Sequence, residues 1–349
     1  MAAIPPSTSS PTSSPLTPVT LLTGFLGSGK TTLLNRLLAS PALHDTAVLI
    51  NEYGATPIDH LLVRSSSDNI TVLANGCVCC SVAGDMVNAL RDLYFKRSQG
   101  VIPAFRRVVI ETTGLADPAP ILHTLLEMPL VVARYVLSGI VTTVDATHGL
   151  AQFEAHAESA KQAAVADRLV ITKCDLASAE TIHALRARLS KLNPGATIIE
   201  AVDGEVDPDI IFDTGLHHPG KWLNAGAYRP LPPKNTAAAP RHDERIAAFC
   251  VRYEQPVVWD ELINALEILQ SVRADNLLRI KGIVNVAGEP QPRVIHAVQH
   301  TLYPAAKLPA WPDNDHSTRL VFIVKDLDPA FIQDTLDACF STAPTFVSA

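Results

Sequence analysis

Short apolar runs alternate with longer amphipathic stretches through the first two thirds of the chain. The runs are rich in Val, Ile, Leu and Thr, which is typical of strands that are buried on both faces of a sheet. The stretches between them place apolar residues at helical spacing. This alternation predicts an α/β domain over residues 18–215, with a mostly parallel sheet and helices on both faces. The predicted strands are residues 18–23, 46–51, 70–74, 107–111, 139–144, 168–172 and 196–200, and the predicted helices include 84–97, 118–128 and 178–192.

The pattern changes after this domain. Residues 216–241 are rich in Pro, Gly and Ala and show little periodicity, so we interpret them as a linker. Residues 242–343 combine strand-like runs with two amphipathic helices. This favours a smaller C-terminal α+β domain, one sheet with its helices on one face. We predict that its cysteines, Cys250 and Cys339, are core residues and that its histidines are surface or packing residues.

The start of the chain and its composition exclude several classes of protein. Residues 1–17 are rich in Ser, Pro and Thr and lack the basic and apolar regions of a secretory signal, so we predict a disordered tail. No apolar run reaches the length of a membrane span, so we expect no membrane partner. The 349 residues include 28 Lys or Arg and 35 Asp or Glu without a basic block, which argues against a nucleic-acid partner. We therefore expect a cytoplasmic protein.

Three of the six cysteines, Cys77, Cys79 and Cys80, lie within the segment NGCVCC, residues 75–80. The chain has too few cysteines for a disulfide framework, and adjacent residues rarely reach disulfide geometry. The spacing also lacks the C-x-x-C of thioredoxin-like redox sites. Thiolates are ligands that suit Zn²⁺ or Cu⁺. A metal site is therefore the favoured interpretation, and a redox pair and inert buried thiols are the alternatives.

The segment GFLGSGKTT, residues 24–32, lies between a predicted strand and a predicted helix. It matches the phosphate-binding pattern G-x-x-x-x-G-K-[ST]. The glycines let the backbone curl so that its N–H groups face phosphate oxygens, and the helix start adds the positive end of its dipole. The lysine is predicted to reach the β- and γ-phosphates, and the first threonine to bind Mg²⁺. The predicted nucleotide-binding residues of this segment are Gly24, Gly27, Ser28, Gly29, Lys30, Thr31 and Thr32.

A second segment, IETTGLADPAP, begins at the end of the strand 107–111, at the sheet edge where such folds bind ligands. We assign Glu111 to the Mg²⁺ site together with Thr31. We assign the Gly114 N–H to sensing the γ-phosphate. Lys30, Glu111 and Gly114 are therefore the predicted catalytic residues.

A third segment, TKCD, has the shape of the base-reading loop of GTPases. Asp175 can accept hydrogen bonds from the guanine N1–H and 2-amino group, and the stem of Lys173 can stack along the base. Thr172 stands where asparagine is usual. A buried carboxylate that the wrong base leaves unpaired is costly, so GTP is the predicted nucleotide.

The order GFLGSGKTT, NEYG, NGCVCC, IETTGLADP and ADRLVITKCD resembles the CobW-like family of P-loop GTPases and metallochaperones. The likeness is to its YjiA-type branch, which is related to the UreG and HypB nickel-insertion GTPases. It covers residues 18–340 and includes the C-terminal runs. The resemblance implies a GTP-hydrolysing chaperone that delivers Zn²⁺ or a similar ion to a client metalloprotein. We expect slow hydrolysis because no arginine finger is evident, and a GTP-dependent homodimer by analogy with the class.

This family places its C-x-C-C motif between two nucleotide-sensing segments, which are INEYG at residues 50–54 and ETTG at residues 111–114 here. The resemblance implies that Cys77, Cys79 and Cys80 hold the metal, with Glu52 or water completing the site. The γ-phosphate would fix both segments and thereby change the geometry of the cysteines between them.

The chain departs from the family pattern in two places. Ile50 and Ala55 stand where relatives often have acidic residues, and His217 and His218 stand in place of a histidine-rich run. We interpret this histidine pair as a plain loop. The alternative functions are an activator of one metalloenzyme, of the nitrile hydratase or cobalamin-pathway type, a P-loop ATPase or kinase with structural cysteines, and a metal buffer that does not hydrolyse its nucleotide.

Overall fold

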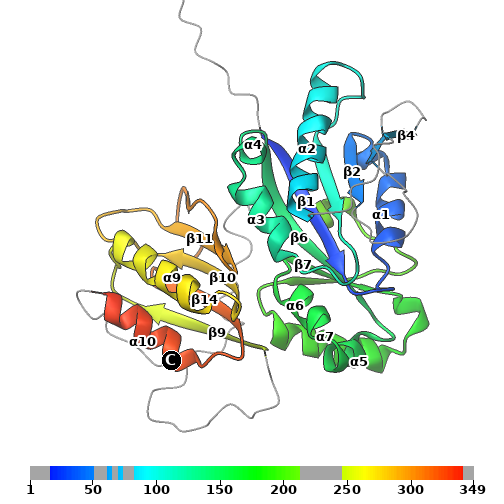
Figure 1. Cartoon of the computed structure of the whole chain (residues 1–349). Coiled ribbons are helices and arrows are strands. Elements are labelled where there is room, and N and C mark those ends of the chain that lie inside the picture. The colour runs from blue at the N-terminus through cyan, green and yellow to red at the C-terminus, as the bar shows by residue number, and fades with distance from the viewer. Residues whose placement is uncertain (1–15, 51–60, 65–69, 74–81, 213–245, 341–349) are drawn as a thin grey trace, which may run out of the picture.

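The computed structural model describes residues 16–50, 61–64, 70–73, 82–212 and 246–340. These residues form two sheets, each with its own helices (Figure 1). The predicted tail up to residue 15 and the predicted linker at 216–241 lie outside the described residues. So do the predicted metal ligands Glu52, Cys77, Cys79 and Cys80 and the pair His217 and His218.

The first sheet has the strand order β4-β3-β2-β5-β1-β6-β7-β8. The strands from β2 to β8 in this order are parallel, whereas β3 is antiparallel to both β2 and β4. The predicted fold class, an α/β domain with a mostly parallel sheet, is confirmed. The sequence pattern missed β3, a four-residue strand that pairs antiparallel with both of its neighbours. The strands are β1 (Thr17–Gly24), β2 (Thr46–Ile50), β3 (Leu61–Arg64), β4 (Ile70–Leu73), β5 (Arg107–Glu111), β6 (Tyr135–Asp145), β7 (Arg168–Thr172) and β8 (Thr197–Glu200).

Helices cover both faces of this sheet (Figure 1). Two neighbouring residues of β1 show the double burial: Leu21 belongs to the core beneath α2, α3, α6 and α7, and Leu22 to the core beneath α1. Each is at most 3% exposed, which explains why the strands read as continuous apolar runs. Within the described ranges, no helix is both long and apolar enough to cross a membrane. The helices are α1 (Lys30–Ala39), α2 (Val82–Ser98), α3 (Ala119–Glu127), α4 (Pro129–Val132), α5 (Gly149–Ala155), α6 (Ala157–Ala164), α7 (Ala179–Leu192) and α8 (Pro208–Phe212), with short 3₁₀ helices η1 (Pro41–Leu43) and η2 (Cys174–Leu176).

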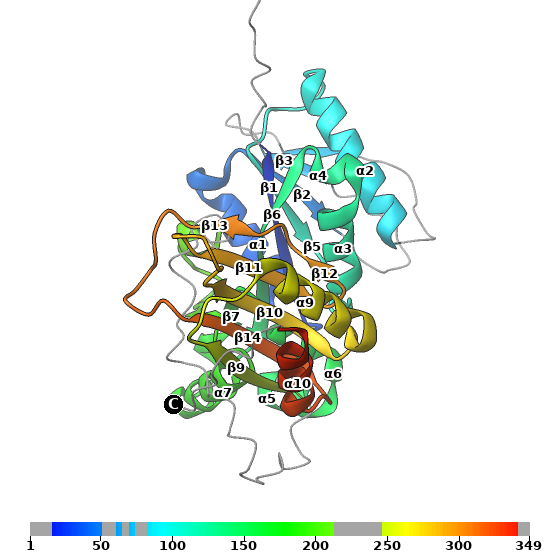
Figure 2. The ribbon, with the colours of Figure 1, turned by 90° about the vertical axis from the view of Figure 1, so that its left-hand side faces the viewer.

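The second sheet is antiparallel and has the order β12-β11-β10-β14-β9, with β13 paired to β11. Its two helices pack on one face, as the sequence predicts, and form a separate core with it (Figure 2). Its elements are β9 (Ile246–Tyr253), α9 (Trp259–Arg273), β10 (Leu277–Val284), β11 (Arg293–Val298), β12 (Thr301–Leu302), β13 (Ala306–Lys307), β14 (Thr318–Lys325) and α10 (Pro329–Cys339).

The opposite face of the second sheet turns toward the first domain (Figure 1). Its apolar residues Ile246, Leu278, Val298 and Ile323 join the core of that domain. Beside them lies a buried ion cluster, in which Asp167 pairs with Arg279 and with Lys281. Asp167 precedes β7, at the opposite end of this strand from Thr172. The C-terminal domain is thus fixed to the first domain away from the carboxyl edge of the parallel strands.

Candidate nucleotide site

Four parallel strands end close together at one edge of the first sheet. Their last residues are Gly24, Glu111, Asp145 and Thr172, at the ends of β1, β5, β6 and β7. A cavity of about 790 Å³ opens at this edge. It is lined by the phosphate loop and the first turn of α1 (Leu26, Gly27, Gly29, Lys30, Thr31, Thr32), by Ile50, by the segment after β5 (Glu111, Thr112, Thr113, Gly114, Leu115, Ala116, Asp117), by Pro120 and Ile121 of α3, and by Lys173. The volume and position suit a nucleotide.

The phosphate loop requires glycine at both of its ends. Gly24 has a φ of 141°, and a Cβ added there would lie 2.4 Å from the Thr143 hydroxyl. Gly29, at the N-cap of α1, has a φ of 86°. Both values lie in the left-handed region that side chains disfavour. These glycines let the loop curl at the start of a helix, which is an arrangement that binds anions.

Two side chains hold this loop in shape. Lys30, only 9% exposed, donates hydrogen bonds through Nζ to the carbonyls of Gly24 and Phe25, at 3.0 and 3.1 Å. The buried hydroxyl of Ser28 is hydrogen-bonded to that of Thr143 on β6, at 2.6 Å. Ser28 and Lys30 were both predicted from the motif. Their contacts show that the Lys30 ammonium and the Ser28–Thr143 hydroxyl pair both stabilise the loop.

Thr31 and Glu111 lie together, as the sequence analysis proposed. The Thr31 hydroxyl donates to Glu111 Oε1 at 2.6 Å, and Glu111 is 4% exposed at the end of β5. A hydroxyl and a carboxylate are oxygen ligands of the kind that Mg²⁺ prefers. The two residues therefore fit a Mg²⁺ site next to the phosphate loop.

The turn after β5 packs directly on the phosphate loop. Thr112 is tied to β1 by its N–H, which donates to the Leu22 carbonyl, and by its hydroxyl, which donates to that of Thr23. A Cβ added to Gly114 would lie 2.6 Å from the backbone nitrogen of Leu26. Glycine is thus required at position 114 by close approach of two backbones, so this turn lies directly against the predicted phosphate loop.

Thr172 joins the predicted base-reading loop to the predicted phosphate loop. Its hydroxyl donates to the Ser28 carbonyl at 2.7 Å, and the residue is 4% exposed. Threonine in place of the usual asparagine therefore still connects the two loops. Lys173, with a φ of 57°, lines the cavity. Asp175 is exposed in η2 and is not among the residues that line the cavity, so its contact with a base stays a prediction.

Asp145 is a site residue that the sequence analysis missed. It is 2% exposed and accepts hydrogen bonds from Lys173 Nζ at 2.7 Å and from the N–H and hydroxyl of Thr147. Burial alone would raise the pKa of Asp145, but the hydrogen bonds from Lys173 and Thr147 outweigh it and lower the pKa to about 2. The charged carboxylate therefore orients Lys173. Its position at the end of a predicted parallel strand was the available signal.

Thr143 and Gln162 were also missed. Thr143 contacts Ser28 across the loop, and Gln162 of α6 donates to the carbonyls of Gly114 and Ala116. Neither lies in a recognisable motif. Both are brought to the site by contacts between segments that are far apart in the sequence, so no local pattern marks them.

The predicted metal ligands lie outside the described residues, but the strands that lead to them do not. Leu73 of β4 is paired with Leu61 of β3, Leu61 with Leu49 of β2, and Leu49 with Ile110 of β5. These four residues form one row across the sheet. Because β4 and β2 both run parallel to β5, the chain leaves Leu49 and Leu73 at the edge where Glu111 lies. Within the part of the chain that the structure describes, no group of three His, Cys, Asp or Glu residues could hold a metal ion.

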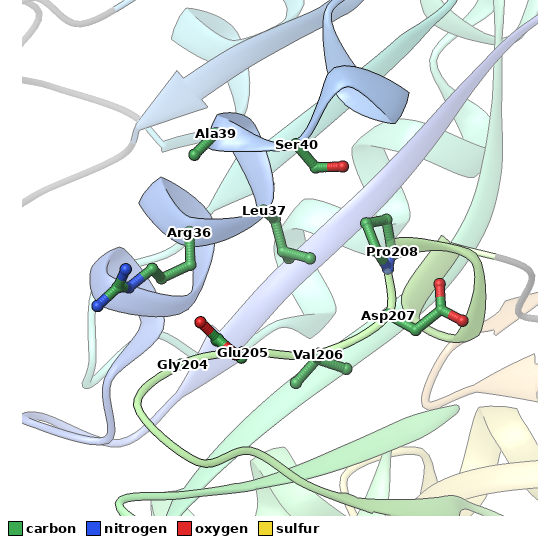
Figure 3. A pocket seen from close by; sticks show the side chains of 9 residues that line it. All are labelled: Arg36, Leu37, Ala39, Ser40, Gly204, Glu205, Val206, Asp207 and Pro208. Carbon is green, nitrogen blue, oxygen red and sulfur yellow. The ribbon is translucent and has the colours of Figure 1, made fainter.

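A second cavity, of about 550 Å³, lies between the end of α1 and the loop that precedes α8 (Figure 3). Leu37, Val206 and Pro208 line this cavity with apolar side chains. Two charged residues line it from opposite sides, Arg36 from α1 and Glu205 from the loop. The phosphate-loop glycines do not line it. We therefore place the nucleotide in the first cavity.

Comparison with known proteins gives two family matches. Residues 18–200 match the CobW/HypB/UreG nucleotide-binding domain, and residues 246–340 match the cobalamin synthesis protein CobW C-terminal domain. The chain is 36% identical over 306 residues to the zinc chaperone YjiA of Escherichia coli, covering 87% of this chain and 93% of that protein. It is 28% identical over 371 residues to the zinc-regulated GTPase metalloprotein activator 1 of Saccharomyces cerevisiae, covering 91% and 82%. The crystal structure of the Zn(II)-bound YjiA GTPase from E. coli matches with a TM-score of 0.68 and 30% identity, over 93% of this chain and 99% of that chain.

Proposed function

The chain belongs to the CobW/HypB/UreG family of GTPases, and on that premise we propose that it hydrolyses GTP to control the binding of Zn²⁺, or a similar ion, and its delivery to a client metalloprotein. One observation carries the proposal. The strand that leads into the C-x-C-C segment ends in the same cross-sheet row as the strands that frame the nucleotide cavity. Nucleotide and metal would then act on segments that leave the same edge of the sheet.

The nucleotide part of the mechanism uses residues whose positions are known. The loop from Gly24 to Gly29 cradles the phosphates with its N–H groups, and Lys30 moves its ammonium from the loop carbonyls to the β- and γ-phosphates. Mg²⁺, held by Thr31 and Glu111, would neutralise charge on the phosphate oxygens when bound. Water attacks the γ-phosphate, and GDP and inorganic phosphate leave. Catalysis rests on positioning and electrostatics, and no arginine finger is evident in the sequence, so we expect slow turnover.

Asp175 supplies base selection in this proposal. Its carboxylate would accept hydrogen bonds from the guanine N1–H and 2-amino group, and adenine has no equivalent pair of donors. Thr172 and Lys173 support this role, because they connect the same loop to the phosphate loop and to Asp145. The loop that binds the guanine base through Asp175 would therefore have a fixed position relative to the loop that binds the phosphates of the same nucleotide.

The metal part of the mechanism rests on linkage. We place the ion on Cys77, Cys79 and Cys80 with Glu52 as a further ligand. The strand before Glu52, β2, ends beside Glu111 of β5, and the strand before the cysteines, β4, ends two strands beyond β2 at the same edge of the sheet. If the γ-phosphate changes metal affinity by a given factor, metal must change GTP affinity by the same factor. Thiolate ligands also need a reducing compartment, so we place the protein in the cytoplasm.

The mouth of the nucleotide cavity supports a partner that depends on the nucleotide. Leu26 of the phosphate loop and Leu115 of the turn after β5 are 53% and 57% exposed. Exposed apolar side chains on segments that touch the phosphates suit an interface. We propose a second copy of the chain there in the GTP state, and light scattering with GDP and with a non-hydrolysable GTP analogue tests this. A mass that stays monomeric with the analogue would remove the dimer from the proposal.

A zinc titration of the full chain tests the function itself. We expect different Zn²⁺ affinities for the nucleotide-free, GDP-bound and GTP-analogue-bound protein, and loss of this binding in the Cys77→Ala/Cys79→Ala variant. Cys339→Ala, in the C-terminal domain, is the matched control and should bind as the parent does. If the double variant binds Zn²⁺ as tightly as the parent, the C-x-C-C segment is not the metal site and the chaperone function is wrong.

A further inference from the structure

Gln162 of α6 reaches the turn that follows β5 although it does not itself line the nucleotide cavity. Its Nε2 donates two hydrogen bonds, to the Gly114 carbonyl at 3.1 Å and to the Ala116 carbonyl at 3.0 Å. The side chain is 1% exposed. Gly114, Leu115 and Ala116 do line the cavity. The turn therefore lies between this buried amide and the cavity.

The helix that carries Gln162 is well anchored. The Gln162 carbonyl accepts a hydrogen bond from the Thr142 hydroxyl of β6 at 2.9 Å. Asn193 caps the C-terminal end of the same helix, next to Gln162, by donating from Nδ2 to the carbonyls of Ala163, Ala164 and Ala166. A fixed support of this kind allows one side chain to set the geometry of a turn.

The two carbonyls that accept hydrogen bonds from Gln162 determine where the N–H groups of the turn point. In a trans peptide the C=O of one residue and the N–H of the next lie on opposite sides. Because the carbonyls of Gly114 and Ala116 are directed at Gln162, the N–H groups of Leu115 and Asp117 are directed away from α6. That is the side on which the cavity lies.

The choice of residue also needs an explanation. Gln162 Oε1 is buried and has no hydrogen-bond partner among the described residues. A buried polar atom of this kind is costly, and an apolar side chain of the same length would fill the space without it. The amide is therefore better explained by what its N–H groups do for the turn than by the stability of α6.

We infer that Gln162 is a positioning residue for GTP hydrolysis, which sets the peptide planes of the turn at residues 114–117 so that its N–H groups face the γ-phosphate. The inference rests on the proposed role of this turn in sensing the γ-phosphate. GDP lacks that phosphate. Loss of the Gln162 contacts should therefore impair hydrolysis and leave GDP binding unchanged.

The test compares steady-state GTP hydrolysis and GDP affinity in the full chain. Gln162→Met keeps the length of the side chain and removes both N–H donors. We expect kcat to fall by about 10- to 100-fold, the effect of a small misplacement of catalytic groups, with GDP affinity within about 2-fold of the parent. Gln162→Asn, which keeps an amide but is too short to hold both carbonyls, should give a smaller loss of the same kind.

Asn193→Ala is the matched control, since it removes amide hydrogen bonds from the same helix and touches none in the turn. It should lower thermal stability and leave kcat within about 3-fold of the parent, because Thr142 still holds the Gln162 carbonyl and both hydrogen bonds from Gln162 to the turn remain. An unchanged kcat in Gln162→Met, or an equal fall of kcat and GDP affinity, would overturn the inference, as would the same kinetic pattern in Asn193→Ala. A parent that hydrolyses GTP but shows no nucleotide-dependent Zn²⁺ binding would overturn the proposed function alone.

Discussion

Asp167 joins the two domains, and its replacement by asparagine has an effect that can be worked out from the structure. The carboxylate is 3% exposed and accepts hydrogen bonds from Arg279, from Lys281 Nζ at 3.0 Å and from the Ile140 N–H at 2.9 Å. Asparagine has nearly the same shape but no charge. In Asp167→Asn, two buried cations would face each other without the anion between them.

Removing one partner of a buried ion pair typically costs about 3–5 kcal/mol, because the other charge stays buried. A Coulomb estimate agrees, since two unit charges 4 Å apart interact by about 4 kcal/mol at an effective dielectric constant of about 20. Protein domains are stable by only about 5–15 kcal/mol. We therefore expect Asp167→Asn to lower the free energy of unfolding by about 3–5 kcal/mol at pH 6.

Lys281 makes this loss depend on pH. Burial and the neighbouring Arg279 lower the pKa of Lys281 to about 8, although Asp167 raises it. Without Asp167 this pKa falls further below its value in the unfolded chain. The folded variant then sheds the lysine proton at a lower pH than the folded parent, and this relieves the repulsion. The destabilisation should therefore shrink as the pH rises toward about 8 and stay level above it.

Urea unfolding at pH 6 and pH 9, followed by tryptophan fluorescence, measures both effects, because Trp259 and Trp311 lie in the C-terminal domain. Glu200→Gln is the control, since its ion pair with Arg186 is 41% exposed on both sides. Such a surface pair should contribute less than about 1 kcal/mol. The reasoning is refuted if Asp167→Asn loses no more stability than Glu200→Gln, or if its loss is the same at both pH values.

Three further predictions concern the nucleotide site. Glu111→Gln should lower kcat for Mg²⁺-GTP by about 100-fold because it removes a charged oxygen beside Thr31. Hydrolysis assays over a range of Mg²⁺ concentrations measure this, and a kcat and Mg²⁺ dependence like those of the parent would contradict the prediction. Asp175→Ala should reduce the preference for GTP over ATP by about 100-fold or more, measured by competition with a fluorescent nucleotide, and an unchanged preference would assign base selection elsewhere. The hydrogen bonds from Lys173 and Thr147 hold the pKa of Asp145 at about 2 against the effect of burial, so the stability that they contribute is complete above the ordinary pKa of 3.8 and is lost as the pH falls toward 2. In acid-unfolding curves the difference in stability between the parent and Asp145→Asn should therefore close over this range. A difference that stays constant would contradict this prediction.

Much of the nucleotide site follows from local sequence. The spacing of Gly24, Gly29 and Lys30 already specifies a curled loop at the start of a helix, because the glycine conformations and the helix dipole are local properties. The rule that parallel strands end at one edge places Glu111 and Thr172 near this loop. Both were predicted, and the structure brings them within hydrogen-bond contact of Thr31 and Ser28.

The sequence left out what depends on pairs of distant residues. β3 turns antiparallel between β2 and β4, and a run of four residues carries no periodicity that shows this. Asp145 follows the same strand-end rule as Glu111, yet only its contact with Lys173 identifies it as a site residue. Gln162 looks like any polar residue on a short helix until its contact with Gly114 is known.

The sequence by itself determined the fold class, the phosphate loop and the family, because strand runs, helix periods and a glycine-lysine motif are written into neighbouring residues. Only the tertiary structure decided how the parts are joined. Ser28 meets Thr143 across 115 residues, Thr172 meets the Ser28 carbonyl across 144, and Arg279 meets Asp167 across 112. Such contacts arise from the packing of whole strands and helices, which brings distant side chains together at positions that no local pattern specifies.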